Sequence, residues 1–216
     1  MEARTAGRDA GTESTVVTAP KIYTRKGDDG STGLLYGGRV GKDSPGPDAY
    51  GAVDEAVSAL GLARAETERG SELDELVVRL QRELFVVGAE LATSPDKRDK
   101  LTPEVSLTTE AMVTALEPVI DDVTARYDPP TEFVLPGENR VAAALDVART
   151  VVRRAERQAV AAAHAGWLDG SFVVAYLNRL ADLVYTLARW QEGTFRPVRT
   201  SNSRSGDTRS GRPDPR

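Results

Sequence analysis

The helical spacing of apolar residues constrains the fold more than any other feature of this sequence. In five segments, apolar side chains recur at intervals of three and four, while strict alternation is nearly absent. A spacing of three and four puts apolar residues on one face of a helix, whereas alternation would indicate a strand. We therefore predict an all-α fold, a five-helix bundle.

Capping and breaking residues set the expected ends of these helices, because Ser, Thr, Asn and Asp favour helix starts and Gly favours helix ends. Pro is tolerated in the first turn but bends or stops a helix elsewhere. In chain order, the expected boundaries are a start near Pro47; a cap at Ser71, with Asp74 in the capping box, and a stop at Pro95; a cap at Thr108 and a bend at Pro118; a cap at Asn139 and an end near His164; a cap at Asp169 or Ser171 and a stop at Gly193.

The inward faces follow from the same spacing. We expect them to consist of Tyr50, Val53, Val57 and Leu60; Leu73, Leu76, Leu80, Leu84, Val87 and Leu91; Leu145, Ala148, Val152, Ala155 and Ala159; and Val173, Leu177, Leu180, Val184, Leu187 and Trp190.

The length of 216 residues suits one domain with tails. Residues 1–19 and 196–216 have no periodicity and are expected to be disordered, which leaves a domain over 20–195. The second tail holds six Arg against two Asp, whereas the whole chain has a net charge of -5. Because the tail is basic, the folded part is more acidic than the chain as a whole, and an acidic domain argues against a nucleic-acid groove.

The chain has no Cys and one His, His164. This excludes disulfides, a Cys nucleophile and zinc sites built from Cys or paired His, and we assign His164 no role. No apolar run approaches the roughly 20 residues of a membrane helix, and the first twenty residues do not resemble a targeting segment. We expect a cytoplasmic protein without membrane or nucleic-acid partners.

The segment from Thr24 to Lys42 contains six Gly together with Lys26, Arg39 and Lys42. Gly lets successive backbone N–H groups face one point, and such a nest binds phosphate while nearby cations neutralise its charge. The spacing does not match a Walker loop. The alternative is a flexible loop with scattered charge.

An arginine-rich stripe lies on the fourth expected helix. Arg149, Arg153, Glu156 and Arg157 are spaced four, three and one apart, so they share a face, and the arginines repel one another unless an anion intervenes. Arg suits polyphosphate recognition. The alternative is a solvated charged face.

Asp54, on the first expected helix, lies beside the apolar row at a flank where an arginine from a neighbour could meet it. On the last expected helix, Asn178 and Asp182 share a face. The alternative for all three is ordinary hydrogen bonding between helices.

In this order, the segments resemble the PduO-type ATP:cob(I)alamin adenosyltransferases. The resemblance covers residues 21–191 and is most specific where RRAER is followed on the next helix by YLNRL. It rests on IYTRKGDDGSTGL, GGRVGKDSPGPDAYGAVDEAVSALGLARA, LQRELFVVGAELAT, FVLPG, ARTVVRRAERQ and YLNRLADLVYTLAR.

This resemblance implies a homotrimer with sites between subunits, which bind ATP with Mg²⁺ on its phosphates and cob(I)alamin as co-substrate. It implies that Asp54 and Arg149 form an ion pair between subunits at the corrinoid pocket, that Phe133 displaces the lower axial ligand of cobalt, and that Arg153 also takes part in catalysis. The implied ATP-binding residues are Thr24, Arg25, Lys26, Gly27, Asp28, Thr32, Gly33, Lys42, Arg153, Arg154, Ala155, Glu156, Arg157 and Asn178.

The implied reaction transfers the 5′-deoxyadenosyl group of ATP to Co(I) and releases triphosphate. It fits the residue inventory because Co(I) is itself the nucleophile, so the protein has only to orient the substrates and stabilise an anionic leaving group. A corrinoid reductase and an adenosylcobalamin-dependent enzyme are possible partners. The alternatives are a carrier or regulatory bundle that binds ATP or corrinoid without turnover, and a purely structural assembly.

Four positions depart from the usual family pattern. These are Lys26 in place of Thr, Val57 in place of Asn, Glu138 in place of Gly and Asp146 in place of His. Asp146 precedes Arg149 by three residues and could therefore compete for it as an ion-pair partner.

Overall fold

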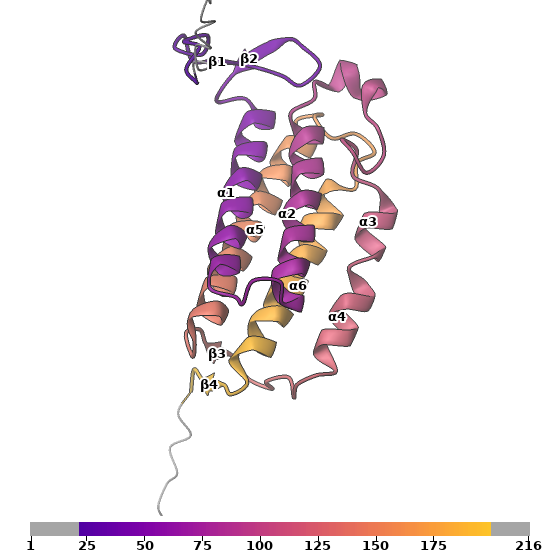
Figure 1. Cartoon of the computed structure of the whole chain (residues 1–216). Helices are drawn as coiled ribbons and strands as arrows, with labels where there is room; N and C mark the ends of the chain where they lie inside the picture. Colours follow the sequence, from indigo (N-terminus) through magenta and orange to yellow (C-terminus); the bar gives the residue numbers. More distant parts are fainter. Residues whose placement is uncertain (1–21, 200–216) are drawn as a thin grey trace, which may run out of the picture.

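The computed structural model describes residues 22–199, and four long helices dominate it (Figure 1). They are α1 (Pro45–Ala65), α2 (Glu72–Leu91), α5 (Arg140–His164) and α6 (Val173–Glu192). Helix α5 packs against both α1 and α6, and α1 packs against α2. The prediction of an all-α bundle is confirmed.

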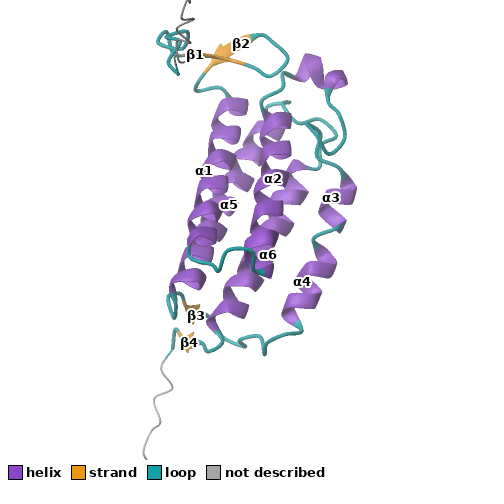
Figure 2. Ribbon diagram, viewed as in Figure 1, coloured by secondary structure: helices purple, strands orange, loops and turns teal. Residues whose placement is uncertain are grey.

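Shorter elements occupy one side and the two ends of the bundle (Figure 2). The 3-10 helix η1 (Pro95–Lys100) follows α2, and the short helices α3 (Glu110–Thr114) and α4 (Glu117–Thr124) lie against α6. Two small antiparallel pairs complete the fold: β1 (Ser31–Gly33) with β2 (Arg39–Gly41), and β3 (Val134–Leu135) with β4 (Arg196–Pro197). The sequence pattern did not indicate these pairs.

The core contains the apolar rows that the helical spacing predicted. The α5 row from Leu145 to Ala159 is fully buried, as is the α6 row from Val173 to Leu187. Tyr50, Val57, Leu76 and Trp190 are partly buried at the edges of the same core. Alanines on α5 allow close approach of its neighbours, which explains how one helix packs against two others.

Several helix boundaries agree with the expected caps. The side chains of Ser71 and Asn139 accept hydrogen bonds from the N–H groups of Asp74 and Ala142, as N-caps do. Gly193 ends α6 with a φ of 69°. Helix α1 begins at Pro45, two residues before the predicted start, because Ser44 is its N-cap.

The third expected helix is different in the structure. It is broken into α3 and α4 rather than bent, since Pro118 lies in the first turn of α4. Its cap is Thr109, whose hydroxyl accepts from Met112 N, and not Thr108. Thr108 is buried, and its N–H donates to Glu90 at 2.7 Å.

The cap predicted for the last helix also needs correction. Helix α6 begins at Val173 with Phe172 as its N-cap residue, which makes no side-chain capping bond. Ser171 Oγ accepts from Val173 N at 3.1 Å, so this hydroxyl satisfies an N–H of the first turn from one residue further out. Asp169 is not the cap.

Trp167 joins three helices at the upper end of the bundle. Its indole Nε1 donates to the carbonyl of Leu91 at 2.8 Å, so one of the last carbonyls of α2, which lacks a partner within the helix, is hydrogen-bonded. The ring lies against Gly46 in the first turn of α1: a Cβ added there would be 2.3 Å from two ring carbons. Gly46 is therefore required by this close approach.

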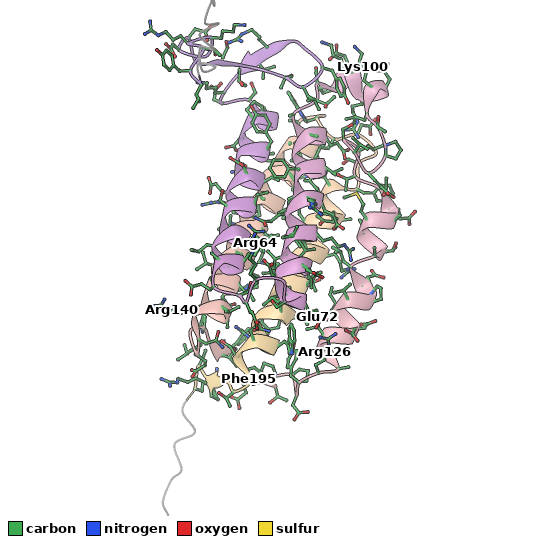
Figure 3. All side chains as sticks on the ribbon, viewed as in Figure 1. Arg64, Glu72, Lys100, Arg126, Arg140 and Phe195 are labelled. Atoms are coloured by element: carbon green, nitrogen blue, oxygen red, sulfur yellow. The ribbon has the colours of Figure 1, made fainter. Side chains whose placement is uncertain are left out.

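Arg126 holds the lower end of α4 to the bundle (Figure 3). It donates two hydrogen bonds to Glu72 at the start of α2, both at 2.8 Å, and its guanidinium lies 5.2 Å from the ring centre of Trp190. This bidentate pair with a stacked aromatic fixes α4 in place more firmly than a single exposed ion pair would.

The predicted tails lie mostly outside the described residues, which exclude 1–21 and 200–216. Arg196 and Pro197, assigned to the second tail from sequence, form β4. Across residues 22–199, no helix is both long and apolar enough to cross a membrane. Within the same range, no three His, Cys, Asp or Glu side chains gather as a metal site would require.

Candidate functional site

The glycine-rich segment folds as a hairpin at the upper end of the bundle (Figure 1). Strands β1 and β2 pair with Thr32 opposite Val40 and Gly33 opposite Arg39. Gly37 and Gly38 in its turn have φ values of 85° and 95°, which favour glycine. The second half of the segment, from Ser31 to Gly41, is therefore a paired hairpin.

Two cations of the hairpin shape the peptide that precedes it. Lys42 Nζ donates to the carbonyl of Gly27 at 2.8 Å, and Arg39 donates to the carbonyl of Lys26. Arg39 Nε also donates to Ser31 Oγ at 3.0 Å. The side chains of Thr24, Arg25, Lys26 and Asp28 are exposed, while Gly27 is partly buried and the N–H groups of Lys26 and Asp28 donate to Thr24 Oγ1 and Arg25 O.

Asp29 supports the same turn. It accepts hydrogen bonds from Ser31 N at 2.9 Å and from Ser31 Oγ at 2.7 Å, and these bonds hold its pKa below the usual range. The carboxylate therefore stays charged and closes the turn around Gly30. Asp29 and Ser31 were absent from the residues expected to form the site.

The hairpin is anchored to the segment after α2. Lys97 Nζ donates to the carbonyl of Gly37 at 2.8 Å, and Leu35 N donates to Ala92 O at 2.9 Å. A 3.2 Å hydrogen bond joins the hydroxyls of Tyr36 and Ser106. Sequence reasoning missed these contacts because they connect loops about 60 to 70 residues apart and have no periodic signal.

Glu90, buried at the end of α2, fixes that anchoring segment in turn. One of its oxygens accepts from Arg98 Nη2 and the other from Thr108 N, both at 2.7 Å. A buried carboxylate with both oxygens bonded in this way is stable, and it orders η1 and the loop beneath the hairpin.

The arginine stripe on α5 has separate partners along its length. Arg153 is exposed, and no acidic partner lies within ion-pair distance of it in residues 22–199. Arg157 Nη1 donates to the carbonyl of Arg153 at 2.9 Å, and Arg154 pairs with Glu55 of α1. Arg153 therefore keeps its guanidinium available for an anion.

Helix α6 contributes to the same face. Asn178 Nδ2 donates to Glu156 Oε1 at 2.9 Å, so the structure brings these two predicted site residues together. Asp182 instead pairs with Arg179 at 3.1 Å. Ala155, which was grouped with the ATP-binding residues, is fully buried, and its methyl group belongs to the core rather than to the exposed face.

Arg149 takes part in a largely buried charge cluster between α5 and α6. Its Nε donates to Asp146 Oδ1 at 3.3 Å, as the spacing suggested, and Arg189 donates to Asp146 Oδ2. Arg189 Nε lies 2.9 Å from Glu192 Oε2. Burial raises the pKa of Glu192, an effect that Arg189 opposes.

Asp54 lines a groove between α1 and α2. The groove has a volume of about 360 Å³, and its walls are mostly apolar; they include Tyr50, Val57, Phe85 and Gly88. Phe85 is 66% exposed, so its ring contributes to the apolar surface of the groove. Asp54 is exposed and makes no ion pair with another residue of the described chain.

Phe133 lies in the loop before β3, at the lower end of the bundle. Its side chain is 90% exposed, and its carbonyl accepts from Val198 N at 2.8 Å beside the β3–β4 pair. Glu138, one of the departures, pairs with Arg196 of β4 at 3.2 Å. The loop is therefore attached to the C-terminal strand while its aromatic ring faces outward.

Within one chain, the β1–β2 hairpin and β3, which directly follows Phe133, lie at opposite ends of the bundle (Figure 1). Helix α5, with 25 residues, spans most of this separation and is about 37 Å long. A single chain therefore holds the hairpin and the Phe133 loop roughly one helix length apart.

Comparisons with known proteins identify the family to which this chain is similar. A model of the cobalamin adenosyltransferase family matches residues 22–191. The corrinoid adenosyltransferase of Citrobacter freundii is 41% identical over 174 residues, which cover 81% of this chain and 96% of that protein. The human corrinoid adenosyltransferase is 35% identical over 193 residues, covering 88% and 77%.

A solved structure gives the same result for the fold. It is a variant of a PduO-type ATP:corrinoid adenosyltransferase from Lactobacillus reuteri complexed with cobalamin and ATP. It superimposes with a TM-score of 0.73 at 31% identity, over 83% of this chain and 100% of that one.

Proposed function

Because this chain belongs to the cobalamin adenosyltransferase family, we propose that it transfers the 5′-deoxyadenosyl group of ATP to cob(I)alamin. The products are adenosylcobalamin and inorganic triphosphate. The Co(I) lone pair attacks C5′, the C5′–O5′ bond breaks, and triphosphate leaves with the bonding electrons. Cobalt, part of the substrate, is formally oxidised to Co(III).

One observation carries this proposal beyond the family match: Arg153 is exposed without an acidic partner in the described chain, beside a fixed Glu156–Asn178 pair. An uncompensated arginine on a helix face suits a polyanion, whereas a solvated face would pair its charges. Arg153 would bind the departing triphosphate, and Glu156 and Asn178 would hold the nucleoside in position.

The hairpin supplies the other part of the ATP site. Thr24, Arg25, Lys26 and Asp28 are exposed, Gly27 between them is partly buried, and Lys42 and Arg39 bond to the carbonyls of this stretch. Thr32 and Gly33 continue it in β1. Backbone N–H groups and cations of this segment would bind the phosphates, which would carry Mg²⁺. Arg154 and Arg157 would add positive charge from α5.

The corrinoid would lie between subunits, near Phe133. The exposed ring of Phe133 would displace the lower axial ligand of cobalt. Asp54 of one subunit would pair with Arg149 of another beside the pocket. The Lactobacillus reuteri relative carries cobalamin and ATP together, which supports two adjoining sites.

The assembly is proposed to be a homotrimer. Three features support shared sites: the hairpin and Phe133 are far apart in one chain, Asp54 has no ion-pair partner in the described residues, and the groove beside it exposes Phe85. On the α1–α5 face, Leu62 and Val147 are also 56% and 52% exposed. Apolar side chains of this kind are often covered by a second subunit.

Residues 20–195 would form the catalytic domain. We propose a cytoplasmic setting, where ATP is available and a reductase can supply Co(I). An adenosylcobalamin-dependent enzyme would accept the product.

An anaerobic assay tests the function. With ATP and chemically reduced cobalamin, we expect the Co(I) spectrum to be lost and intact triphosphate to appear in equal amount. Binding of both substrates without loss of Co(I) would favour the carrier or regulatory alternative. Phosphate and pyrophosphate as the first products would contradict the mechanism.

Mixed assemblies test the shared site. Asp54→Ala and Arg149→Ala are each expected to weaken cobalamin use much more than ATP affinity, since each breaks the same ion pair. Co-expressed, the two variants should regain activity, because random assembly leaves about a quarter of the interfaces with an intact pair. Light scattering should show three times 23.2 kDa for each sample. Active monomers, or no gain on co-expression, would contradict the model.

Phe133→Ala tests the role of the exposed ring. We expect it to spare ATP binding and to slow reduction of Co(II) cobalamin, because the lower ligand must leave before reduction. Cobinamide has no lower base, so its reduction should change little. Equal losses on both corrinoids, measured with the same reductant, would show that Phe133 only packs its loop.

A further inference from the structure

The carboxylate of Asp146 contacts two arginines at once, although only one of them belongs to the proposed site. Its Oδ1 accepts from Arg149 Nε at 3.3 Å, and its Oδ2 accepts from Arg189. Asp146 is 4% exposed and Arg189 2%, whereas the side chain of Arg149 is 29% exposed. The contacts thus run from a buried arginine to one that reaches the surface.

The buried end of this chain of contacts is fixed. Arg189 lies 2.9 Å from Glu192, and its guanidinium is 5.1 Å from the ring centre of Tyr185. With almost no exposed surface and two further neighbours, Arg189 has little freedom to rotate. It therefore determines where the carboxylate of Asp146 points.

The geometry at Arg149 leaves it able to bind a second acid. Asp146 uses only Nε, so the two terminal amino groups of the guanidinium remain free to pair end-on with another carboxylate. An arginine held at one edge loses less conformational entropy when its other edge binds, because its rotamer is already selected.

We infer that Asp146 is a positioning residue, which orients Arg149 toward the corrinoid interface by joining it to the buried Arg189. This rests on the proposed function, since it assigns Arg149 to the interface. Asp146 itself would contact neither substrate, so the effect of substituting Asp146 should depend entirely on Arg149.

A double-mutant cycle tests this dependence. Asp146→Asn should raise the corrinoid KM by roughly tenfold, as coupled neighbours commonly do, and leave the ATP KM within about twofold. In an Arg149→Ala background, Asp146→Asn should cause no further rise. If the two substitutions raised the corrinoid KM independently, so that their effects multiplied in the double variant, the inference would be overturned. Equal rises in the corrinoid KM and the ATP KM would likewise indicate a general structural role.

Two controls address folding. Asp146→Asn leaves the charge of Arg189 buried with less compensation and could lower stability. Asp146→Asn/Arg189→Met removes both charges of this buried contact, so it should show the same roughly tenfold rise in corrinoid KM even where Asp146→Asn alone does not fold. Arg189→Met alone removes the group that fixes Asp146 and should therefore already raise the corrinoid KM. Glu83→Ala, which removes the acceptor of the buried Tyr176 hydroxyl, should affect stability without raising the corrinoid KM.

The wild-type assay separates this inference from the proposed function. If wild-type protein binds cob(II)alamin but does not turn over, the function fails, and the same cycle is measured as corrinoid Kd from the visible spectrum. An unchanged corrinoid Kd or KM in Asp146→Asn, or no corrinoid binding by wild type, would overturn the positioning role.

Discussion

Arg153→Ala is expected to lower the rate of adenosyl transfer by about ten- to hundredfold at saturating ATP, while the helix content stays unchanged. Each charge-assisted contact to a leaving oxygen contributes roughly 1.5 to 3 kcal/mol, which corresponds to that loss in rate. Arg153 is exposed on α5, so alanine, a strong helix former, leaves no cavity. Single-turnover loss of the Co(I) spectrum measures the chemical step.

Two further variants distinguish phosphate binding from a general loss of charge. Arg153→Lys keeps the charge but loses the planar fork, and should fall between wild type and Arg153→Ala. Arg82→Ala removes an exposed arginine of α2 and should have the wild-type rate. An unchanged rate in Arg153→Ala would mean that the stripe is a solvated face.

Gly46→Ala should produce the largest loss of stability. The added methyl would lie 2.3 Å from two carbons of the Trp167 ring and 2.8 Å from its Nε1. The ring must therefore move away from Leu91 O, so overpacking and a broken hydrogen bond together cost about 2 to 4 kcal/mol. For a chain of this size we expect the Tm to fall by roughly 5 to 10 °C. Thermal unfolding followed by circular dichroism at fixed protein concentration measures it.

A glycine further along the same helix provides the control. At Gly61, the added methyl would meet only Gln81 Nε2, at 3.2 Å, which donates to the carbonyl of Val57. Weakening of that bond is opposed by the better helix propensity of alanine, so Gly61→Ala should change stability by less than about 1 kcal/mol. Replacing Trp167 by Ala should cost less in the Gly46→Ala protein than in wild type, because the collision has already displaced the ring. Additive losses would contradict the assigned contact.

The bundle could be predicted from the sequence because its signals are local. The rows of α5 and α6 are buried as the spacing of three and four required, and Ser71, Asn139 and Gly193 act at the expected boundaries. Each signal needs only a few neighbouring residues. The error at Thr108 shows the limit, since two adjacent threonines have similar propensity and a distant Glu90 decides between them.

The organisation of the site could be predicted only in part. The resemblance grouped Glu156 with Asn178, and the structure joins them. The β1–β2 pairing, the Lys97 anchor and the Asp146–Arg189 contact depend on loops and helices that meet only after the chain has folded. Ala155 shows the converse: it belonged both to the predicted inward row and to the implied ATP-binding residues, and its burial agrees with the helical spacing rather than with the motif.

The separation of the hairpin from Phe133 also affects how substitutions in this family should be interpreted. In the proposed homotrimer, residues that cooperate in one site are encoded in one gene but meet between different copies of the chain. Selection would then couple positions at opposite ends of the bundle, which α5 separates by about 37 Å, too far for direct contact within one chain. In a map of covarying positions, pairs between the hairpin and the Phe133 loop would look like errors if one chain were considered alone. Those pairs would instead report the geometry of the assembly.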